Sequence, residues 1–105
     1  MELELFWTKT AQNNLREIYE CYKFKAGVSI ASKLIKDIFN KTTGLPSNPK
    51  IGQTEQSLIK RKKDFRYLVY KKYKIIYSVN KEFNRIEIRS IFDYRLNPYK
   101  INEID

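Results

Sequence analysis

The stretch FRYLVYKKYKIIYSVNKEFNRIEIRSIF, residues 65–92, determines most of the fold. Three runs within it are rich in aromatic and β-branched residues, which predicts strands: Phe65–Tyr70, Tyr73–Asn80 and Arg85–Phe92. The connections, Lys71-Lys72 and residues 81–84, are too short for crossover helices. We therefore expect three neighbouring strands paired antiparallel as a meander.

The chain before the meander predicts one strand and a pair of helices. Leu3, Leu5 and Trp7 alternate with Glu2, Glu4 and Phe6, which indicates a short strand with one buried face. Thr8 is a natural N-cap for the helix that follows. From Lys9 to about Lys25 the apolar residues recur at helical spacing: Ala11, Leu15, Ile18, Tyr19 and Tyr22. The same spacing places Asn14, Arg16, Glu17 and Lys23 on the outer face.

A second helix is predicted after Gly27, which stops the first, with Ser29 as its cap. Its expected apolar face consists of Ile30, Ala31, Leu34, Ile35, Ile38 and Phe39. The Pro/Gly cluster at residues 44–52 then separates this helical hairpin from the meander. The predicted order is β-α-α-β-β-β, an α+β fold ending in a short C-terminal tail or helix. One sheet face should pack on the hairpin, which leaves the other face or its rim free to bind a partner.

Size and composition limit the class of protein. The 105 residues fit a single domain, 1–105, and the aromatic content is too high for a disordered chain. A net charge of +9 attracts polyanions or acidic protein surfaces. The lone Cys21 forms no internal disulfide, and we interpret it as a packed helix residue. The N-terminus has neither the basic start nor the apolar run of a signal peptide, and no segment is apolar enough to span a bilayer, so we expect a cytoplasmic protein without a membrane partner.

Positive charge is concentrated between residues 50 and 74, where nine basic residues face two acidic ones. Alternation places Arg66, Leu68 and Tyr70 on one face, a basic and aromatic combination that suits phosphates and bases. The candidate nucleic-acid or target-binding residues are Lys60, Arg61, Lys62, Lys63, Arg66, Lys74 and, further on, Arg95. The run of residues 60–63 is equally typical of a solvated loop or of an edge strand protected from aggregation.

The side chains available for chemistry are restricted. The chain has no histidine, no cysteine spacing typical of metal sites and no glycine-rich phosphate loop, so we expect no metal and no cofactor. Lys, Arg, Tyr and carboxylates remain, and these cleave RNA only through charge stabilisation and an activated 2′-hydroxyl. Trp7 and most strand aromatics, including Tyr67, Tyr73 and Tyr77, are expected to pack in the core and sheet. After the last strand, Asp93 is expected to form a structural salt bridge, with Arg95 as one possible partner.

Three short sequence motifs, in their order along the chain, resemble the RelE/ParE toxin superfamily of type II toxin–antitoxin systems. The first is Trp7-Thr8 followed by Ala11, Leu15 and Ile18. The second comprises Phe65–Val69 and Tyr73–Tyr77. The third, residues 91–98, contains Phe92-Asp93, Arg95 and Asn97-Pro98. The similarity covers nearly the whole chain.

The resemblance implies a cytoplasmic toxin that arrests bacterial growth, of the kind linked to plasmid stabilization. It implies neutralisation by a cognate antitoxin, with which similar toxins often form a heterotetramer. It also implies two alternative targets. RelE-like members cleave mRNA in the ribosome, whereas ParE-like members poison DNA gyrase and are not nucleases. A third alternative is a degenerate toxin that retains only antitoxin or nucleic-acid binding.

Carried over by position, the RelE-like catalytic candidates are Lys74, Arg95 and the C-terminal Tyr99. Asp93 stands where those nucleases place another basic residue, and an aspartate repels the scissile phosphate. The resemblance therefore favours the ParE-like branch and gyrase, with the mRNA endonuclease as the alternative.

Overall fold

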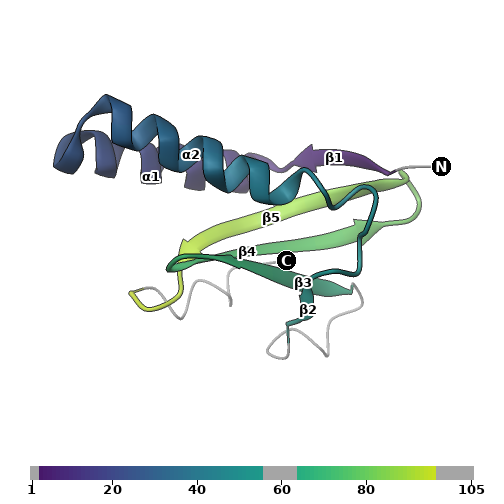
Figure 1. The fold of residues 1–105 in the computed structure, drawn as a ribbon. Coiled ribbons are helices and arrows are strands. Elements are labelled where there is room, and N and C mark those ends of the chain that lie inside the picture. The colour runs from purple at the N-terminus through teal and green to yellow at the C-terminus, as the bar shows by residue number, and fades with distance from the viewer. Residues whose placement is uncertain (1–2, 56–63, 97–105) are drawn as a thin grey trace.

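The computed structural model describes residues 3–55 and 64–96. The elements follow the order β1 (Glu4–Trp7), α1 (Lys9–Ala26), α2 (Val28–Thr42), β2 (Gln53–Thr54), β3 (Phe65–Tyr70), β4 (Tyr73–Asn80) and β5 (Arg85–Asp93). Figure 1 shows the two helices side by side over one face of the sheet, with the end of their hairpin projecting beyond the strands. The α+β prediction and the order of its six main elements are confirmed, and β2 is an additional short strand. The predicted C-terminal tail lies outside the described residues.

The helix ends follow from local chemistry. Thr8 caps α1 as predicted, because its Oγ1 accepts a hydrogen bond from the Ala11 amide at 3.2 Å. The same hydroxyl donates to the Ile88 carbonyl at 2.8 Å, which ties the start of α1 to β5. Gly27 ends α1 with φ of 94°, a conformation that favours glycine. The predicted Ser29 cap is wrong: α2 begins at Val28, directly after Gly27, and has no side-chain cap.

The sheet has the order β1-β5-β4-β3-β2. The pairs β3–β4 and β4–β5 are antiparallel, which confirms the meander. The N-terminal strand β1 pairs parallel with β5, with Leu5 opposite Ile86 and Trp7 opposite Ile88. The helical hairpin and strands β2 to β4 lie between β1 and β5 in the chain, which gives the long connection that a parallel pair requires. A bulge shifts the β4–β5 register between Ile76 and Tyr77, and this bulge lies where α1 docks on β5.

The main core lies between the helices and the sheet. Ala11, Ile38, Ile75, Ile86 and Ile88 are completely buried there. Tyr73 and Tyr77 are buried as predicted, and Leu3, Leu5 and Trp7 pack against the same cluster. Neither described helix is long and apolar enough to cross a membrane.

Three helix predictions are corrected by the packing. Asn14 is buried rather than outside, because its Oδ1 accepts hydrogen bonds from Ser90 Oγ at 3.1 Å and from the Ile91 amide at 3.0 Å. Ile30 and Phe39 are exposed rather than in the core, and Phe39 stacks on Trp7 with ring centroids 5.9 Å apart. Cys21 is exposed rather than packed.

The opposite sheet face carries a second cluster. Phe65, Ile76 and Phe92 are buried there, with Tyr67 packed against them. The face expected to be free to bind is therefore apolar and buried at its centre.

Candidate functional site

Lys74, the basic residue of the central strand, is held by an ion pair. It lies on the sheet face away from the helices, in the row formed with Val69 and Phe92. Its Nζ is 2.9 Å from Oε2 of Glu55, a carboxylate that is only 4% exposed, and 4.3 Å from the centroid of the Tyr67 ring. The Lys74 charge is thus matched by a buried anion rather than left for a phosphate. Sequence reasoning missed Glu55, because the residue is 19 positions from Lys74 and follows a strand too short to recognise.

The Arg66 side chain also forms an ion pair and a hydrogen bond within the fold. Its Nε lies 3.1 Å from Asp64 Oδ2, and its guanidinium donates to the Gly52 carbonyl at 3.0 Å. Leu68 and Tyr70, which share its face, pack against the main core. The predicted basic and aromatic surface on this face is therefore wrong, because the alternation points those side chains toward the helices.

Asp93 fixes the turn that follows β5. Its Oδ1 accepts hydrogen bonds from the backbone amides of Arg95 at 2.9 Å and Leu96 at 3.3 Å. Its Oδ2 lies 3.7 Å from Lys72 Nζ. The predicted structural salt bridge of Asp93 is thus present, and its partner is Lys72. The buried aspartate orients the turn through backbone hydrogen bonds, so Arg95 extends without an acidic partner among the described residues.

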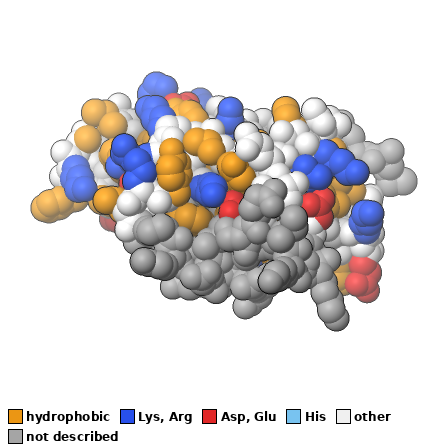
Figure 2. Space-filling view, turned by 90° about the horizontal axis from the view of Figure 1, so that it is seen from below, with side chains coloured by type: hydrophobic (Ala, Val, Ile, Leu, Met, Phe, Trp, Pro, Cys, Tyr) orange, Lys and Arg blue, Asp and Glu red, His pale blue; other side chains and the backbone are white. Residues whose placement is uncertain are grey.

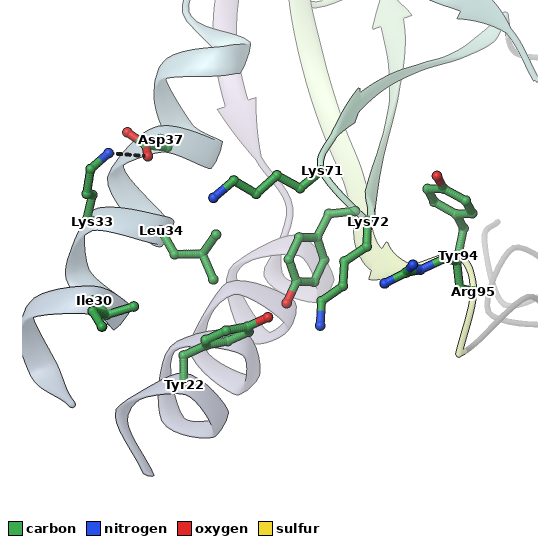
Figure 3. Close-up of a pocket in the computed structure, with 10 residues that line it drawn as sticks. Tyr22, Ile30, Lys33, Leu34, Asp37, Lys71, Lys72, Tyr94 and Arg95 are labelled. Carbon is green, nitrogen blue, oxygen red and sulfur yellow. Dashed lines mark hydrogen bonds and ion pairs between the residues drawn. The ribbon is translucent and has the colours of Figure 1, made fainter. Parts of the chain in front are cut away.

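Arg95 lines a pocket of about 400 Å³ between the helical hairpin, the β3–β4 turn and the end of β5. Figure 3 shows side chains from both layers around it, with Lys33, Leu34 and Asp37 coming from α2. Lys71 and Lys72 reach it from the turn, and Tyr22 from α1. The sequence pattern placed Tyr22 on the apolar face of the first helix and did not predict this pocket, because the pocket walls come from segments far apart in the chain.

The floor of the pocket is a hydrogen-bonded group of two tyrosines and one lysine. Lys72 Nζ lies 5.3 Å from the Tyr22 ring centroid and 5.7 Å from that of Tyr73. A hydrogen bond with Lys72 lowers the pKa of Tyr22, and the same contact raises the pKa of Lys72. Burial, followed by the hydrogen bond with Tyr22, raises the pKa of Tyr73. Lys72 is thus the group that stabilises the ionised form of Tyr22.

The sequence-predicted site residues do not form one site among the described residues. Lys74 lies on the sheet face away from the helices, Arg66 is tied to the β2 edge, and Arg95 lines the pocket on the hairpin side. The remaining candidates, Lys60, Arg61, Lys62, Lys63 and Tyr99, lie outside the described residues.

The profile of the family described as "ParE toxin of type II toxin-antitoxin system, parDE" matches residues 5–96. This chain therefore belongs to the ParE toxin family of type II toxin–antitoxin systems. No curated protein sequence matches it.

Solved structures share the fold. A chain of the chromosomal ParDE toxin–antitoxin system of P. aeruginosa matches with a TM-score of 0.74 and 23% identity, covering 88% of this chain and 96% of that chain. A chain of the RelBE2 toxin–antitoxin complex of Mycobacterium tuberculosis gives a TM-score of 0.55 and 16% identity, covering 89% and 99%. A mutant of E. coli toxin RelE in the free state gives 0.56 and 15%, covering 98% and 93%. The family match confirms the RelE/ParE resemblance on its ParE side, and the solved structures share the fold.

Proposed function

We propose that this toxin arrests bacterial growth by binding and poisoning DNA gyrase in the cytoplasm. The supporting observation is the separation of its cations. RNA cleavage without histidine requires cationic groups gathered around one phosphate. Lys74 is paired with the buried Glu55 on one side of the sheet, whereas Arg95 lines a pocket beside the hairpin. The different surroundings of these two residues, which the resemblance assigns to mRNA cleavage, support a target other than mRNA.

We further propose that a cognate antitoxin holds the toxin inactive. Two of the similar structures are described as a ParDE system and a RelBE2 toxin–antitoxin complex, so those relatives associate with antitoxins. A surface with a net charge of +9 complements an acidic partner, since opposite potentials steer association and disfavour wrong partners. Two toxins and two antitoxins in a heterotetramer would fit this pairing.

The test compares two purified systems that do not share a target. In the first, toxin is added to gyrase and relaxed plasmid, and supercoiling is followed by gel electrophoresis. In the second, toxin is added to reconstituted translation programmed with ready-made mRNA, which needs ribosomes but no gyrase. We expect loss of supercoiling, intact message and normal protein synthesis.

One control is necessary because a basic protein also coats DNA without specificity. Relaxation of the supercoiled form of this plasmid by a type I topoisomerase should proceed normally at the toxin concentration that stops gyrase. Cleaved message with active gyrase would replace the proposal by a ribosome-dependent nuclease. A folded toxin that affects neither system would overturn the proposal and indicate a degenerate toxin.

A further inference from the structure

The pocket beside the helical hairpin collects more positive than negative charge. Four cationic side chains line it, and two carboxylates lie within ion-pair distance of its lysines. The cations are Lys33, Lys71, Lys72 and Arg95, and the carboxylates are Asp37 and Asp93. Among the described residues, the cations thus exceed the carboxylates by two. A ligand that fills this pocket is therefore expected to carry negative charge.

One end of the pocket, at α2, is organised around Asp37. Its Oδ2 lies 2.9 Å from Lys33 Nζ and accepts a hydrogen bond from the Tyr70 hydroxyl at 3.0 Å. These two hydrogen bonds, together with the nearby charge of Lys71, lower the pKa of Asp37. Figure 3 shows the Lys71 side chain extending toward this helix. Both lysines of this end therefore face a carboxylate of the protein itself.

The other end of the pocket holds Lys72 and Arg95. The one carboxylate paired with this end among the described residues is Asp93, whose Oδ1 accepts the turn amides. Its Oδ2 is 3.7 Å from Lys72 Nζ, longer than a direct hydrogen bond. Figure 3 shows the Arg95 side chain extending toward Lys72. The hydrogen bond with Tyr22 raises the pKa of Lys72, whereas the like charge of Arg95 opposes that rise. An anion between the two cations would remove their repulsion and gain charge-assisted hydrogen bonds.

The pocket also has apolar and aromatic walls. Ile30 and Leu34 form part of its α2 side, where Ile30 is 56% exposed, and Tyr94 lines the β5 side. Figure 2 shows hydrophobic side chains interleaved with Lys and Arg over the part of the molecule that contains the hairpin end. The cavity of about 400 Å³ falls in the range of roughly 300 to 1,000 Å³ that is typical of small-molecule sites. A bare anion would leave these walls in contact with water, so the ligand needs a ring or other apolar body as well.

We propose that this pocket binds a nucleoside monophosphate, a small phosphate monoester with a ring body. Its phosphate lies between Lys72 and Arg95, and its base and sugar cover Ile30 and Tyr94. A phosphate monoester carries about 1.5 to 2 negative charges at neutral pH, which matches the excess of cations. Its oxygens also suit the planar fork of an arginine beside a lysine. A single carboxylate would leave one of the two positive charges unmatched. The inference goes beyond gyrase poisoning and does not depend on it, because the nucleotide binds to the toxin alone.

The experiment titrates the purified toxin with adenosine 5′-monophosphate (AMP) by isothermal titration calorimetry. The buffer contains about 0.15 M NaCl, which screens exposed charges beyond roughly 8 Å. We expect saturable binding at one site per toxin. Adenosine lacks the phosphate and should bind at least about tenfold more weakly, because the charge-assisted hydrogen bonds are lost. Inorganic phosphate lacks the ring body and should also bind more weakly than AMP.

Two pairs of variants locate the binding site. Arg95→Gln should weaken AMP binding by about tenfold or more. Lys81→Gln is its control, because Lys81 is also exposed but lies in the turn at the opposite end of β4, and it should leave the affinity nearly unchanged. Ile30→Asn should weaken binding through the lost apolar contact. Ile51→Asn, at a similarly exposed isoleucine that does not line the pocket, should not. Circular dichroism of each variant checks that the fold is intact.

Three results would overturn the proposal. The first is the absence of saturable AMP binding. The second is an equal loss of affinity in Arg95→Gln and Lys81→Gln, which would reduce the interaction to general attraction by the charge of +9. The third is inorganic phosphate that binds as tightly as AMP, since the apolar walls would then contribute nothing.

A strand of nucleic acid that ends in a phosphate offers the same chemistry as a free nucleotide. A 5′-phosphorylated single-stranded oligonucleotide therefore competes with AMP in the same assay. We expect it to displace AMP no better than AMP itself does. Displacement at far lower concentrations, lost in Arg95→Gln, would assign the pocket to a strand end and exclude the free nucleotide as its ligand.

Discussion

The hydroxyl of Tyr77 lies 2.9 Å from the amide nitrogen of Gly52, from which it accepts a hydrogen bond, and it donates to the Pro49 carbonyl at 2.8 Å. Tyr77 is completely buried in the centre of β4. This contact fastens the Pro/Gly segment to the sheet just before β2. It leaves no room for a side chain at position 52, because a Cβ there would meet the Tyr77 hydroxyl at 2.5 Å and the Tyr67 carbonyl at 2.8 Å.

Gly52→Ala should therefore lower the free energy of unfolding by about 1 to 3 kcal/mol, the usual cost of overpacking. Gly44→Ala is the control, since a Cβ at that position has nothing within 4 Å. Urea unfolding followed by circular dichroism compares the two variants. Equal stability of both would contradict the tight contact with Tyr77.

Asn14 fastens α1 to the bulged strand β5. Asn14→Ala removes the acceptor for the Ile91 amide and the Ser90 hydroxyl, so we expect a loss of about 1 to 3 kcal/mol in the free energy of unfolding. Asn13→Ala, on the exposed side of the same helix, should change it by less than about 0.5 kcal/mol. Thermal and urea unfolding measure both. Similar effects of the two substitutions would mean that the buried hydrogen bonds contribute nothing specific.

Glu87 should make stability depend on pH. Burial raises the pKa of this carboxyl, but hydrogen bonds from Arg85 and Asn80 and the nearby Arg89 outweigh burial, so its pKa is lowered. A carboxyl with a lowered folded-state pKa contributes stability above its unfolded pKa, and this contribution is lost as pH falls through the folded value. Glu87→Gln should therefore destabilise the protein by about 1 to 3 kcal/mol at neutral pH, and the difference should shrink in acid. Urea unfolding at both pH values checks this, and a constant difference would contradict it.

Tyr22 should ionise at a lower pH than an ordinary tyrosine. The hydrogen bond with Lys72 lowers its pKa from the ordinary value of 10.0, so its tyrosinate absorbance should appear at a lower pH than that of an ordinary tyrosine. Ultraviolet titration of the native protein and of Tyr22→Phe isolates this transition by difference. In Lys72→Met the transition should move to higher pH. A Tyr22 transition that is unchanged in Lys72→Met would exclude the contact as its cause.

Substitutions in the Lys74–Glu55 pair should change the stability of the toxin without abolishing its toxicity. Lys74→Met leaves the buried Glu55 carboxylate without that cation and should cost about 1 to 2 kcal/mol of unfolding free energy. The double variant Lys74→Met with Glu55→Gln should recover part of this loss. Growth arrest by the folded double variant should persist, because the proposed gyrase poisoning does not use Lys74 as a phosphate ligand. Growth without arrest would favour the nuclease.

The local pattern predicted the elements with little error. The strands β3 and β4 begin and end at the predicted residues, and β5 extends the prediction by Asp93, because aromatic and β-branched runs with short connections leave few other conformations. The Thr8 cap and the Gly27 stop also depend on neighbouring residues alone. The family resemblance rested on the same segments, and it indicated a toxin fold without defining a site.

The errors arose where distant segments meet. Asn14 has the polarity of an outer-face residue and is buried only because the β5 bulge presents an amide and a hydroxyl to it. Ile30 and Phe39 have the spacing of core residues, yet the sheet beneath them covers only the Ala31, Leu34 and Ile38 side of α2. Helical periodicity predicts that a face is apolar, but it does not say how wide the opposing surface is.

The sequence by itself determined the helices, the meander, the positive charge and the ParE toxin family, because these depend on periodicity, composition and the order of short phrases. Only the tertiary structure decided which charged side chains are compensated by a partner within the fold. Contacts across the sheet neutralise Lys74 with Glu55 and satisfy Asp93 with Lys72 and the turn amides. The meeting of the hairpin with the β3–β4 turn leaves Lys71 and Arg95 beside a pocket. The residue type determines the charge of a side chain, but the ion pairs that compensate this charge form between residues that only folding brings together.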